Sequence, residues 1–268
     1  SESEAVLRII RLAFDNADIL NVILSGDISA RRVDTLHRCY VRAALVESEG
    51  EIWVAELERP ESPGQRDIVG MALWFLPGTP FLSTERQRRA SNISEFCEVV
   101  GERQSRWFLD YVSPFHSPFL HVQLPTAPEY LPGLDALWNC CCPNPSESFS
   151  TSYQLSKLAI LPGYDNHGLA SALIRPIIER AAREGNRILG QAASDKVTRI
   201  YTHVGCRVLG TVVFMPFPSL KSGLAGGGDR RMVNPLKIWA IELRPEVVLR
   251  RTHWKRSITA SEPILARL

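Results

Sequence analysis

The sequence lacks a hydrophobic run long enough to cross a membrane and lacks an excess of charge of either sign. No apolar stretch approaches the roughly 20 residues that a membrane-spanning helix needs. The 268 residues include 31 basic and 29 acidic side chains, a net charge of only +2. This balance gives no electrostatic reason to expect nucleic acid or an acidic membrane surface as a partner. We therefore expect neither a nucleic-acid-binding nor a membrane protein.

The cysteines also lack the spacing of a zinc site or of a disulfide framework. There are six, three of them contiguous at 140–142, and no Cys-x-x-Cys pair occurs. Neighbouring cysteines cannot easily share one tetrahedral zinc ion, so we predict no metal site. Free thiols in a reducing compartment, and hence a cytoplasmic location, are the better interpretation. The acidic start, Ser-Glu-Ser-Glu, does not resemble a signal peptide.

The remaining composition is that of a globular protein, with 45% hydrophobic and 22% charged residues. We expect a single domain over residues 1–268, with an insertion at about 77–150 and a loosely packed tail from about 244. The insertion begins with a charged, helical stretch from Ser83 to about Asp110. A proline-rich segment follows, and its prolines exclude long helices and central strands. A segment of this kind can be functional or simply a long loop.

Hydrophobic periodicity predicts the elements on either side of the insertion. Before it we expect helices at 4–14 and 29–46, then strands at 51–58 and 67–75 joined by a turn rich in proline and glycine. After it we expect strands at 153–161, 187–192, 207–214 and 236–243, and helices at about 168–183 and 195–204. Pro176 removes a backbone donor inside the first of these later helices and should kink it.

The joint between strand 153–161 and the helix that starts at Gly168 is the strongest candidate site. A helix amino terminus exposes unpaired N–H groups and the positive end of its dipole. Gly168 lets an anion approach those donors closely, and the small residues 170–172 keep the first turn open. The alternative is an ordinary strand–turn–helix connection, since Pro-Gly and Asn are common turn residues.

The segment from 153 to 214 resembles the acetyl-CoA-binding core of the GNAT superfamily of N-acetyltransferases. In that core a strand leads into the loop Arg/Gln-x-x-Gly-x-Gly/Ala and a helix. A second strand and a helix with Asn-x-x-Ala-x-x-x-Tyr follow, before Gly-Phe. The matching loop here is Asp165-Asn166-His167-Gly168-Leu169-Ala170, and the second helix carries Ser194, Val197 and Tyr201, closed by Gly205-Cys206. Residues 4–75 match by element order only.

The resemblance implies an α/β fold with a mixed, mostly antiparallel sheet that is splayed between parallel strands 153–161 and 187–192 and flanked by helices. Acetyl-CoA would be the cosubstrate, with no metal. The positions that would bind it are Leu158, Ala159, Ile160, Asp165, Asn166, His167, Gly168, Leu169, Ala170, Ser171 and Ser194.

The implied reaction is transfer of an acetyl group to an amine by direct attack. A backbone N–H near Leu158 to Ile160 would polarise the thioester carbonyl. Tyr201 would protonate the leaving thiolate as general acid. Alternatively, Tyr201 is a core tyrosine on an amphipathic helix. We expect a small-molecule amine as acceptor, because the insertion could cover an open peptide groove.

Several positions depart from the family pattern. Asp165 stands where Arg or Gln is usual and places a negative charge beside the expected pyrophosphate. The first strand of the family would have to precede residue 4. These departures keep a second interpretation open, namely a weakly active or inactive module that binds acyl-CoA or a protein partner.

The general base has no motif. Its candidates are Asp110, His121, Glu129 and Glu147, whereas His167 and His203 are expected to face solvent or phosphate. Aromatic residues within 107–119 could line an acceptor pocket or form a small core of the insertion. Gly223–Asp229 lacks the Gly-Lys-Ser/Thr ending of a nucleotide-binding P-loop and is interpreted as a flexible hairpin.

Overall fold

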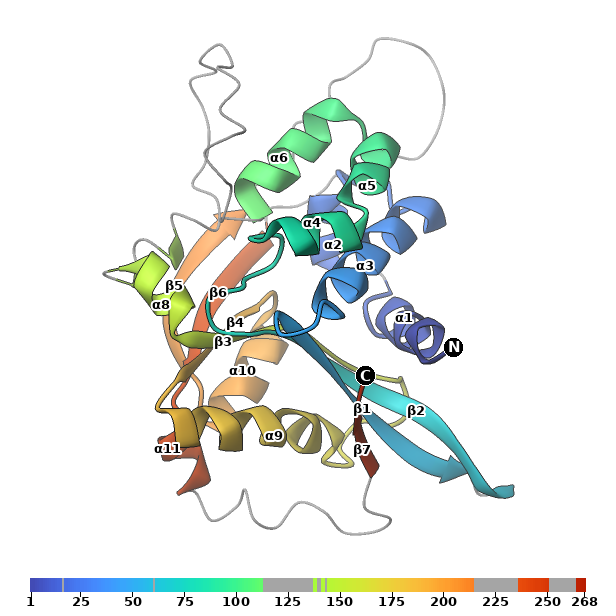
Figure 1. Ribbon diagram of the computed structural model, residues 1–268, viewed down its shortest axis with the longest axis vertical. Coiled ribbons are helices and arrows are strands. Elements are labelled where there is room, and N and C mark those ends of the chain that lie inside the picture. Colours follow the sequence, from blue (N-terminus) through green and yellow to red (C-terminus); the bar gives the residue numbers. More distant parts are fainter. Residues whose placement is uncertain are drawn as a thin grey trace.

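A computed structural model describes residues 1–15, 17–59, 61–112, 137–138, 141–142, 144–214, 236–250 and 264–268. One twisted seven-stranded sheet runs through the molecule in the order β5-β6-β4-β3-β2-β1-β7, with helices on both faces (Figure 1). The strands are β1 (Gly50–Arg59), β2 (Ser62–Phe75), β3 (Ser152–Ile160), β4 (Arg187–Ala192), β5 (Arg207–Phe214), β6 (Leu236–Leu243) and β7 (Ile264–Arg267).

Among the described strands only the β3–β4 pair is parallel, and the other five pairs are antiparallel. The parallel connection is made by helix α9 (Leu169–Glu184), which crosses one face of the sheet. Helix α10 (Asp195–Val204) then follows β4 on the same face. The predicted fold class, mixed and mostly antiparallel with one parallel pair, is confirmed.

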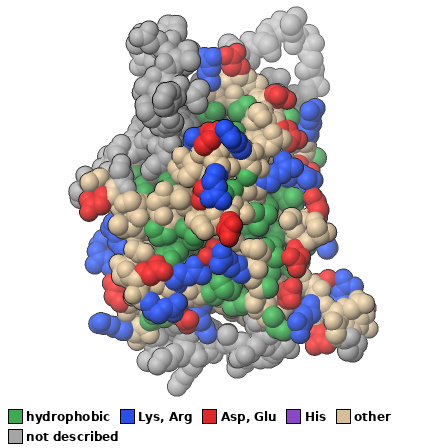
Figure 2. Space-filling view, in the orientation of Figure 1, with side chains coloured by type: hydrophobic (Ala, Val, Ile, Leu, Met, Phe, Trp, Pro, Cys, Tyr) green, Lys and Arg blue, Asp and Glu red, His purple; other side chains and the backbone are tan. Residues whose placement is uncertain are grey.

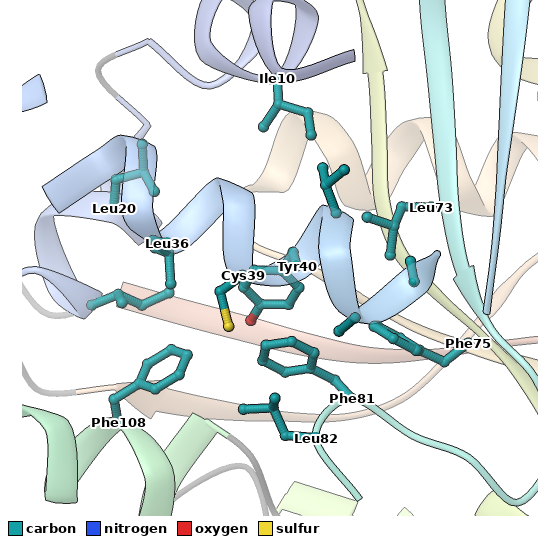
Figure 3. Close-up of a cluster of buried hydrophobic side chains, with 14 of the residues drawn as sticks. Ile10, Leu20, Leu36, Cys39, Tyr40, Leu73, Phe75, Phe81, Leu82 and Phe108 are labelled. Atoms are coloured by element: carbon teal, nitrogen blue, oxygen red, sulfur yellow. The ribbon is translucent and has the colours of Figure 1, made fainter. Parts of the chain in front are cut away.

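The opposite face is covered by the amino-terminal helices α1 (Glu2–Ala13), α2 (Asp18–Ile23) and α3 (Ala30–Ala44) (Figure 1). The periodicity predicted α1 and α3 with nearly these bounds, whereas α2 was not foreseen. Figure 3 shows how side chains of these helices meet β2 and the segment after it in one large apolar cluster. Within the cluster the rings of Tyr40 and Phe81 stack with centroids 4.0 Å apart.

The predicted helical stretch of the insertion is divided into α4 (Glu85–Ser91), α5 (Ile93–Val100) and α6 (Glu102–Val112). The breaks fall at Asn92 and Gly101, which both have positive φ. Trp107 and Phe108 are buried in the main cluster, so the idea that they belong to a small separate core is wrong. The other predicted aromatics of this segment, Tyr111, Phe115 and Phe119, lie outside the described side chains.

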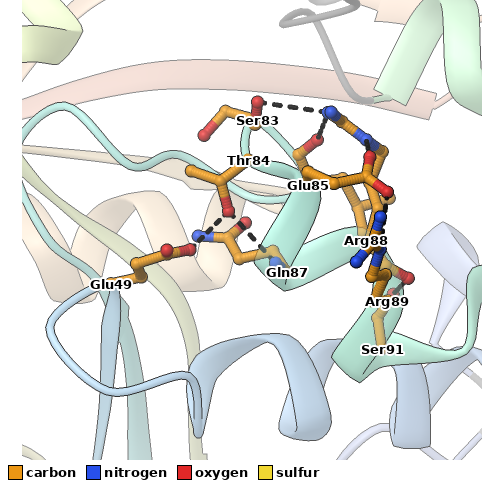
Figure 4. Close-up of polar contacts among 9 residues, drawn as sticks. Glu49, Ser83, Thr84, Glu85, Gln87, Arg88, Arg89 and Ser91 are labelled. Atoms are coloured by element: carbon orange, nitrogen blue, oxygen red, sulfur yellow. Dashed lines mark hydrogen bonds and ion pairs between the residues drawn. The ribbon is translucent and has the colours of Figure 1, made fainter.

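A buried polar network attaches α4 to the body of the domain (Figure 4). Thr84 caps the helix by accepting the Gln87 N–H at 3.0 Å and donates its hydroxyl to the buried carboxylate of Glu49. The Gln87 side chain donates to the Thr79 carbonyl at 2.9 Å. Helix α8 (Pro145–Ser150) then leads into β3. The insertion therefore returns the chain to the sheet immediately before the candidate site.

The described parts of the carboxyl-terminal tail, residues 244–250 and 264–268, pack against the rest of the domain, whereas we predicted loose packing from about 244. Helix α11 (Pro245–Leu249) buries Val248 against α9, and β7 pairs antiparallel with β1. The buried carboxylate of Glu51 links β7 to α9, because it forms ion pairs with Arg180 of α9 at 2.5 Å and with Arg267 of β7 at 3.3 Å. A strand from the end of the chain thus occupies the sheet edge beside β1, and no described strand precedes α1.

Acidic and basic side chains are interspersed over the face of the molecule seen in Figure 2, with apolar side chains between them. No helix among the described residues is long and apolar enough to cross a bilayer. The same residues contain no group of three or more His, Cys, Asp or Glu placed to hold a metal ion. Cys39, Cys97 and Cys142 are free thiols.

Candidate functional site

The parallel strands β3 and β4 separate partway along their length. They pair from Ser152 opposite Arg187 to Leu155 opposite Gly190, and no further. Beyond that point β3 continues to Ile160 beside β2 alone, and β4 continues to Ala192 beside β6 alone. The sheet therefore has a gap between its two central strands, with its closed end at Leu155 and Gly190.

Two backbone N–H groups of β3 point into this gap. The Leu161 N–H donates to the Val69 carbonyl of β2 at 2.8 Å, and Ala159 lies opposite Met71 in the same register. Because donors alternate sides along an antiparallel strand, the N–H groups of Leu158 and Ile160 face away from β2. Of the three strand positions predicted to contact the cosubstrate, Leu158 and Ile160 thus offer donors, and Ala159 uses its own within the sheet.

A β-bulge at Ser156 lies at the start of the gap. The β2–β3 register passes from Leu73 opposite Lys157 to Trp74 opposite Leu155, which leaves Ser156 without a counterpart. The extra residue changes which side chains face each layer. Leu155 and Leu158 pack toward α9, whereas Ala159 packs toward α1 and α3. A bulge bends and twists a strand, which accounts for the separation of β3 from β4 just beyond it.

The amino terminus of α9 lies at the open end of the gap, because the loop 161–168 directly follows β3. Gly168 caps the helix with φ 74°, a left-handed conformation that favours glycine. The first helical hydrogen bond runs from the Ala172 N–H to the Gly168 carbonyl at 3.0 Å. The N–H groups of residues 169–171 therefore have no partner within the helix and are free to bind an anion.

The loop before this helix terminus is open to solvent. Asp165, Asn166 and His167 are all exposed, and Asn166 has φ 65°. Leu169 is buried at the base of the helix, whereas Ala170 and Ser171 are half-buried on its first turn. The predicted binding loop thus lies at the surface, at the carboxyl end of β3. The helix itself continues through Pro176 to Glu184.

Helix α10 contributes the other predicted residues. Ser194 is its N-cap and accepts the Val197 N–H at 3.2 Å, so its hydroxyl oxygen is engaged in the helix start. Tyr201 is 8% exposed and lines an apolar cavity with Leu155, Gly190 and Ile174. Burial, and to a lesser extent Cys206, raise the pKa of Tyr201 above its usual value. Its hydroxyl therefore stays protonated at neutral pH.

The cavity sits where the two strands part. Leu155 and Gly190 form the last parallel pair, and both line it. Its other walls come from α9, α10 and β6 and are almost entirely apolar, among them Ile178 and Ile241. Two side chains in this lining carry a proton for transfer, the hydroxyl of Tyr201 and the thiol of Cys206. The structure thus brings the predicted acid to the closed end of the gap.

The opposite face of β3 carries a side chain that the sequence analysis missed. Lys157 is the only charged residue in the run from Tyr153 to Leu161, and it points toward α1 and α3. That isolation in an apolar strand was a signal available in the sequence. Burial lowers the pKa of Lys157 to about 8.

Of the four candidates for a general base, the described side chains include only Glu147. Glu147 is exposed on the first turn of α8, where its carboxylate accepts the Asn144 amide at 3.1 Å. This reciprocal contact is a helix cap. His203 is exposed on α10. His121 and Glu129, the side chain of Asp110, and the segment 223–229, which we predicted to be a flexible hairpin, lie outside the described residues.

Comparisons with known proteins find similar structures but no similar sequences. No protein-family model and no curated protein matches the chain. An acetyltransferase structure from Corynebacterium glutamicum, described as histone acetyltransferase HPA2 and related acetyltransferase, is 18% identical over 90% of both chains, with a TM-score of 0.45. Arylalkylamine N-acetyltransferase 2 from Aedes aegypti is 12% identical over 90% of this chain and 93% of its own, with a TM-score of 0.47.

Proposed function

We propose that this chain is an N-acetyltransferase that transfers an acetyl group from acetyl-CoA to the amine of a small molecule. One observation carries the proposal. The parallel pair β3–β4 opens beyond Leu155 and Gly190, and the unpaired donors of Leu158, Ile160 and the α9 terminus lie at the open side of that gap. This is the strand and helix order that the resemblance to the GNAT core implies.

The parts of the site suit the parts of acetyl-CoA. The pyrophosphate is an anion that fits the free N–H groups at residues 169–171. The pantetheine arm contains amides, which can pair with the backbone of Leu158 and Ile160 as an added strand would. The cavity beyond them is apolar and matches an acyl group better than a charged one.

The reaction requires little chemistry from side chains. The neutral amine attacks the carbonyl carbon, and a backbone N–H of the gap stabilises the oxygen as negative charge develops on it. The carbon–sulfur bond then breaks, the amine nitrogen loses its extra proton to solvent or a base, and the thiolate takes a proton. Tyr201 is the donor we assign to that last step, because its buried hydroxyl remains protonated.

A small acceptor is favoured over a protein tail by the way the insertion is attached. Helices α4 and α5 pack against α3, and α6 packs against α5, on the sheet face opposite α9 (Figure 1). The network around Glu49 and Thr84 attaches α4 to the start of β1 (Figure 4). That face is the one from which an acceptor would approach if acetyl-CoA enters beside α9. A covered approach suits a compact amine.

Two measurements on the same protein test the proposal. Acetyl-CoA should raise the melting temperature in a concentration-dependent way, because a ligand that binds only the folded state stabilises it. Thiol release from acetyl-CoA should then depend on an added amine. Stabilisation without amine-dependent release from a broad amine panel would favour the alternative, a module that binds acyl-CoA without turnover. Absence of both effects would refute the proposal.

A further inference from the structure

Lys157 lies in an aromatic setting on the α1 and α3 side of β3. Its Nζ is 4.1 Å from the ring centroid of Tyr40 and 5.1 Å from that of Phe14. Tyr40 is backed by Phe81, stacked on its ring (Figure 3). The rings attract the cation through their π faces but offer its N–H groups no lone pair.

No anion accompanies this cation within the described part of the chain. Every ion pair there is made by an arginine, and no carboxylate or other acceptor binds the Lys157 ammonium. The side chain is half-buried, and its pKa is lowered mainly by lost hydration, which the nearby Cys39 offsets only in part. The Lys157 ammonium therefore has a positive charge and N–H donors that an anion could pair with.

A second nitrogen group beside Lys157 is also without a partner. His37 is fully buried on α3, and neither of its ring nitrogens makes a hydrogen bond. Its ring centroid is 6.3 Å from that of Phe14, the ring that Lys157 also approaches. Burial, followed by the charges of Lys157 and Arg11, lowers the pKa of His37 to about 2. The neutral ring retains one N–H, which is a donor without an acceptor.

The position of Lys157 relates this cluster to the reaction. Its neighbour Leu158 supplies a donor to the gap between β3 and β4, and the two side chains lie on opposite faces of the strand. An acceptor that reaches the gap from the α1 and α3 side passes Lys157 within one residue of that donor. A protonated lysine repels a cationic acceptor there and attracts an anionic one.

We propose that Lys157 binds a carboxylate on the acyl acceptor, so that the preferred substrates are amines of the amino-acid type and polyamines are rejected. This inference rests on the proposed function for the identity of the reaction. It makes Lys157 a specificity-determining residue, with His37 as a neighbouring donor. The carboxylate would satisfy the ammonium N–H groups that the aromatic rings leave unpaired.

The direct test observes Lys157 itself and needs no turnover. The sequence has only five lysines, so reductive methylation with ¹³C-formaldehyde gives few signals, and the Lys157→Met variant identifies the one that belongs to Lys157. N-acetyl-L-phenylalanine and N-acetylglycine should shift this signal and raise the measured pKa of Lys157 by about 0.5 or more. Their amides, which lack the carboxylate, should not. If the acids affect Lys157 no more than exposed Lys237, the proposal fails.

Acceptor preference provides the second readout. With L-phenylalanine and phenethylamine as a matched pair, Lys157→Met should lower the preference in kcat/KM for the amino acid about tenfold, and Lys157→Glu should reverse it. Lys237→Met is the matched control, because Lys237 is an exposed lysine that also lies over an aromatic ring, 4.8 Å from Trp239. An unchanged preference in Lys157→Met would overturn the assignment. Carboxylate binding at Lys157 without acetyl-CoA binding would instead refute the proposed function and leave this site standing.

Discussion

Tyr201 is the side chain on which the proposed chemistry depends most. It follows Ser194 by seven residues, which places it about 10 Å along α10 from the helix start. The ring lines the apolar cavity at the closed end of the gap between β3 and β4. A core tyrosine at this position would need only the packing of its ring, whereas a proton donor needs the hydroxyl as well.

Replacement of Tyr201 with Phe separates the two roles. The ring and its packing remain, so the melting temperature and the affinity for CoA should barely change. Turnover should fall about 100-fold, the scale of losing one positioned proton donor. Stopped-flow or thiol-release kinetics, with calorimetry on the same sample, provide the measurements. A variant that keeps the parental rate would show that Tyr201 is only a wall of the cavity.

Asp165 tests the charge of the binding loop. Its side chain is exposed beside the free N–H groups of α9, where a negative charge opposes a pyrophosphate. Asp165→Arg should therefore tighten CoA binding severalfold, and the gain should shrink as salt is added. Calorimetry at two salt concentrations measures both effects. Equal or weaker affinity would mean that Asp165 points away from the bound phosphates.

Individual residues were predicted unevenly from the sequence. Gly168 was singled out because the absence of a Cβ lets an anion approach the helix start, whereas its left-handed conformation, with φ 74°, was not predicted. The capping role of Ser194 is a local preference that could have been foreseen, since Ser is favoured at a helix start. Lys157 was missed because its significance depends on Phe14 and Tyr40, which are distant in the sequence.

Among the elements, the first turn of α9 carries the most specific claim about the cosubstrate. Gly168 is a poor place to test it, because its positive φ would strain any other residue. Ala170 is half-buried, lies in the helical part of the first turn and can accept a side chain. An acidic residue there favours the helix dipole, so folding is preserved while the anion site is blocked.

Ala170→Glu should therefore abolish acetyl-CoA-dependent thermal stabilisation without lowering the melting temperature of the free protein. The matched control is Gln65→Glu, which makes the same charge change on the exposed end of the β1–β2 hairpin (Figure 1). This control should respond to acetyl-CoA as the parent does. If Ala170→Glu is stabilised as strongly as its control, the phosphates bind elsewhere.

Elements with a strong period were predicted well, and those defined by distant contacts were not. The apolar stripe of α3 and the alternation of β1 gave nearly the observed bounds. The strand β7 has only four residues and exists because β1 offers it a free edge. The division of the insertion at Asn92 and Gly101 depends on positive φ values that a charged helical composition conceals.

For the whole molecule, the gap between β3 and β4 unites the separate features. A bulge at Ser156 starts it, α9 and α10 begin at its open end, and the cavity with Tyr201 lies at its closed end. The order of these parts was predictable because motif spacing fixes which strand precedes which helix. The length over which β3 and β4 pair could not be predicted, because it depends on the bulge in β3 and on contacts with other segments of the chain.

Amide hydrogen exchange tests the central claim, that acetyl-CoA binds as an added strand in this gap. The N–H groups of Leu158 and Ile160 have no partner in the sheet, whereas that of Ala159 faces β2. Acetyl-CoA should slow exchange at Leu158, Ile160 or both by at least about tenfold, and Ala159 should exchange slowly with or without it. Residue-resolved NMR exchange can measure all three. Unchanged exchange at both Leu158 and Ile160 under saturating acetyl-CoA would contradict the account.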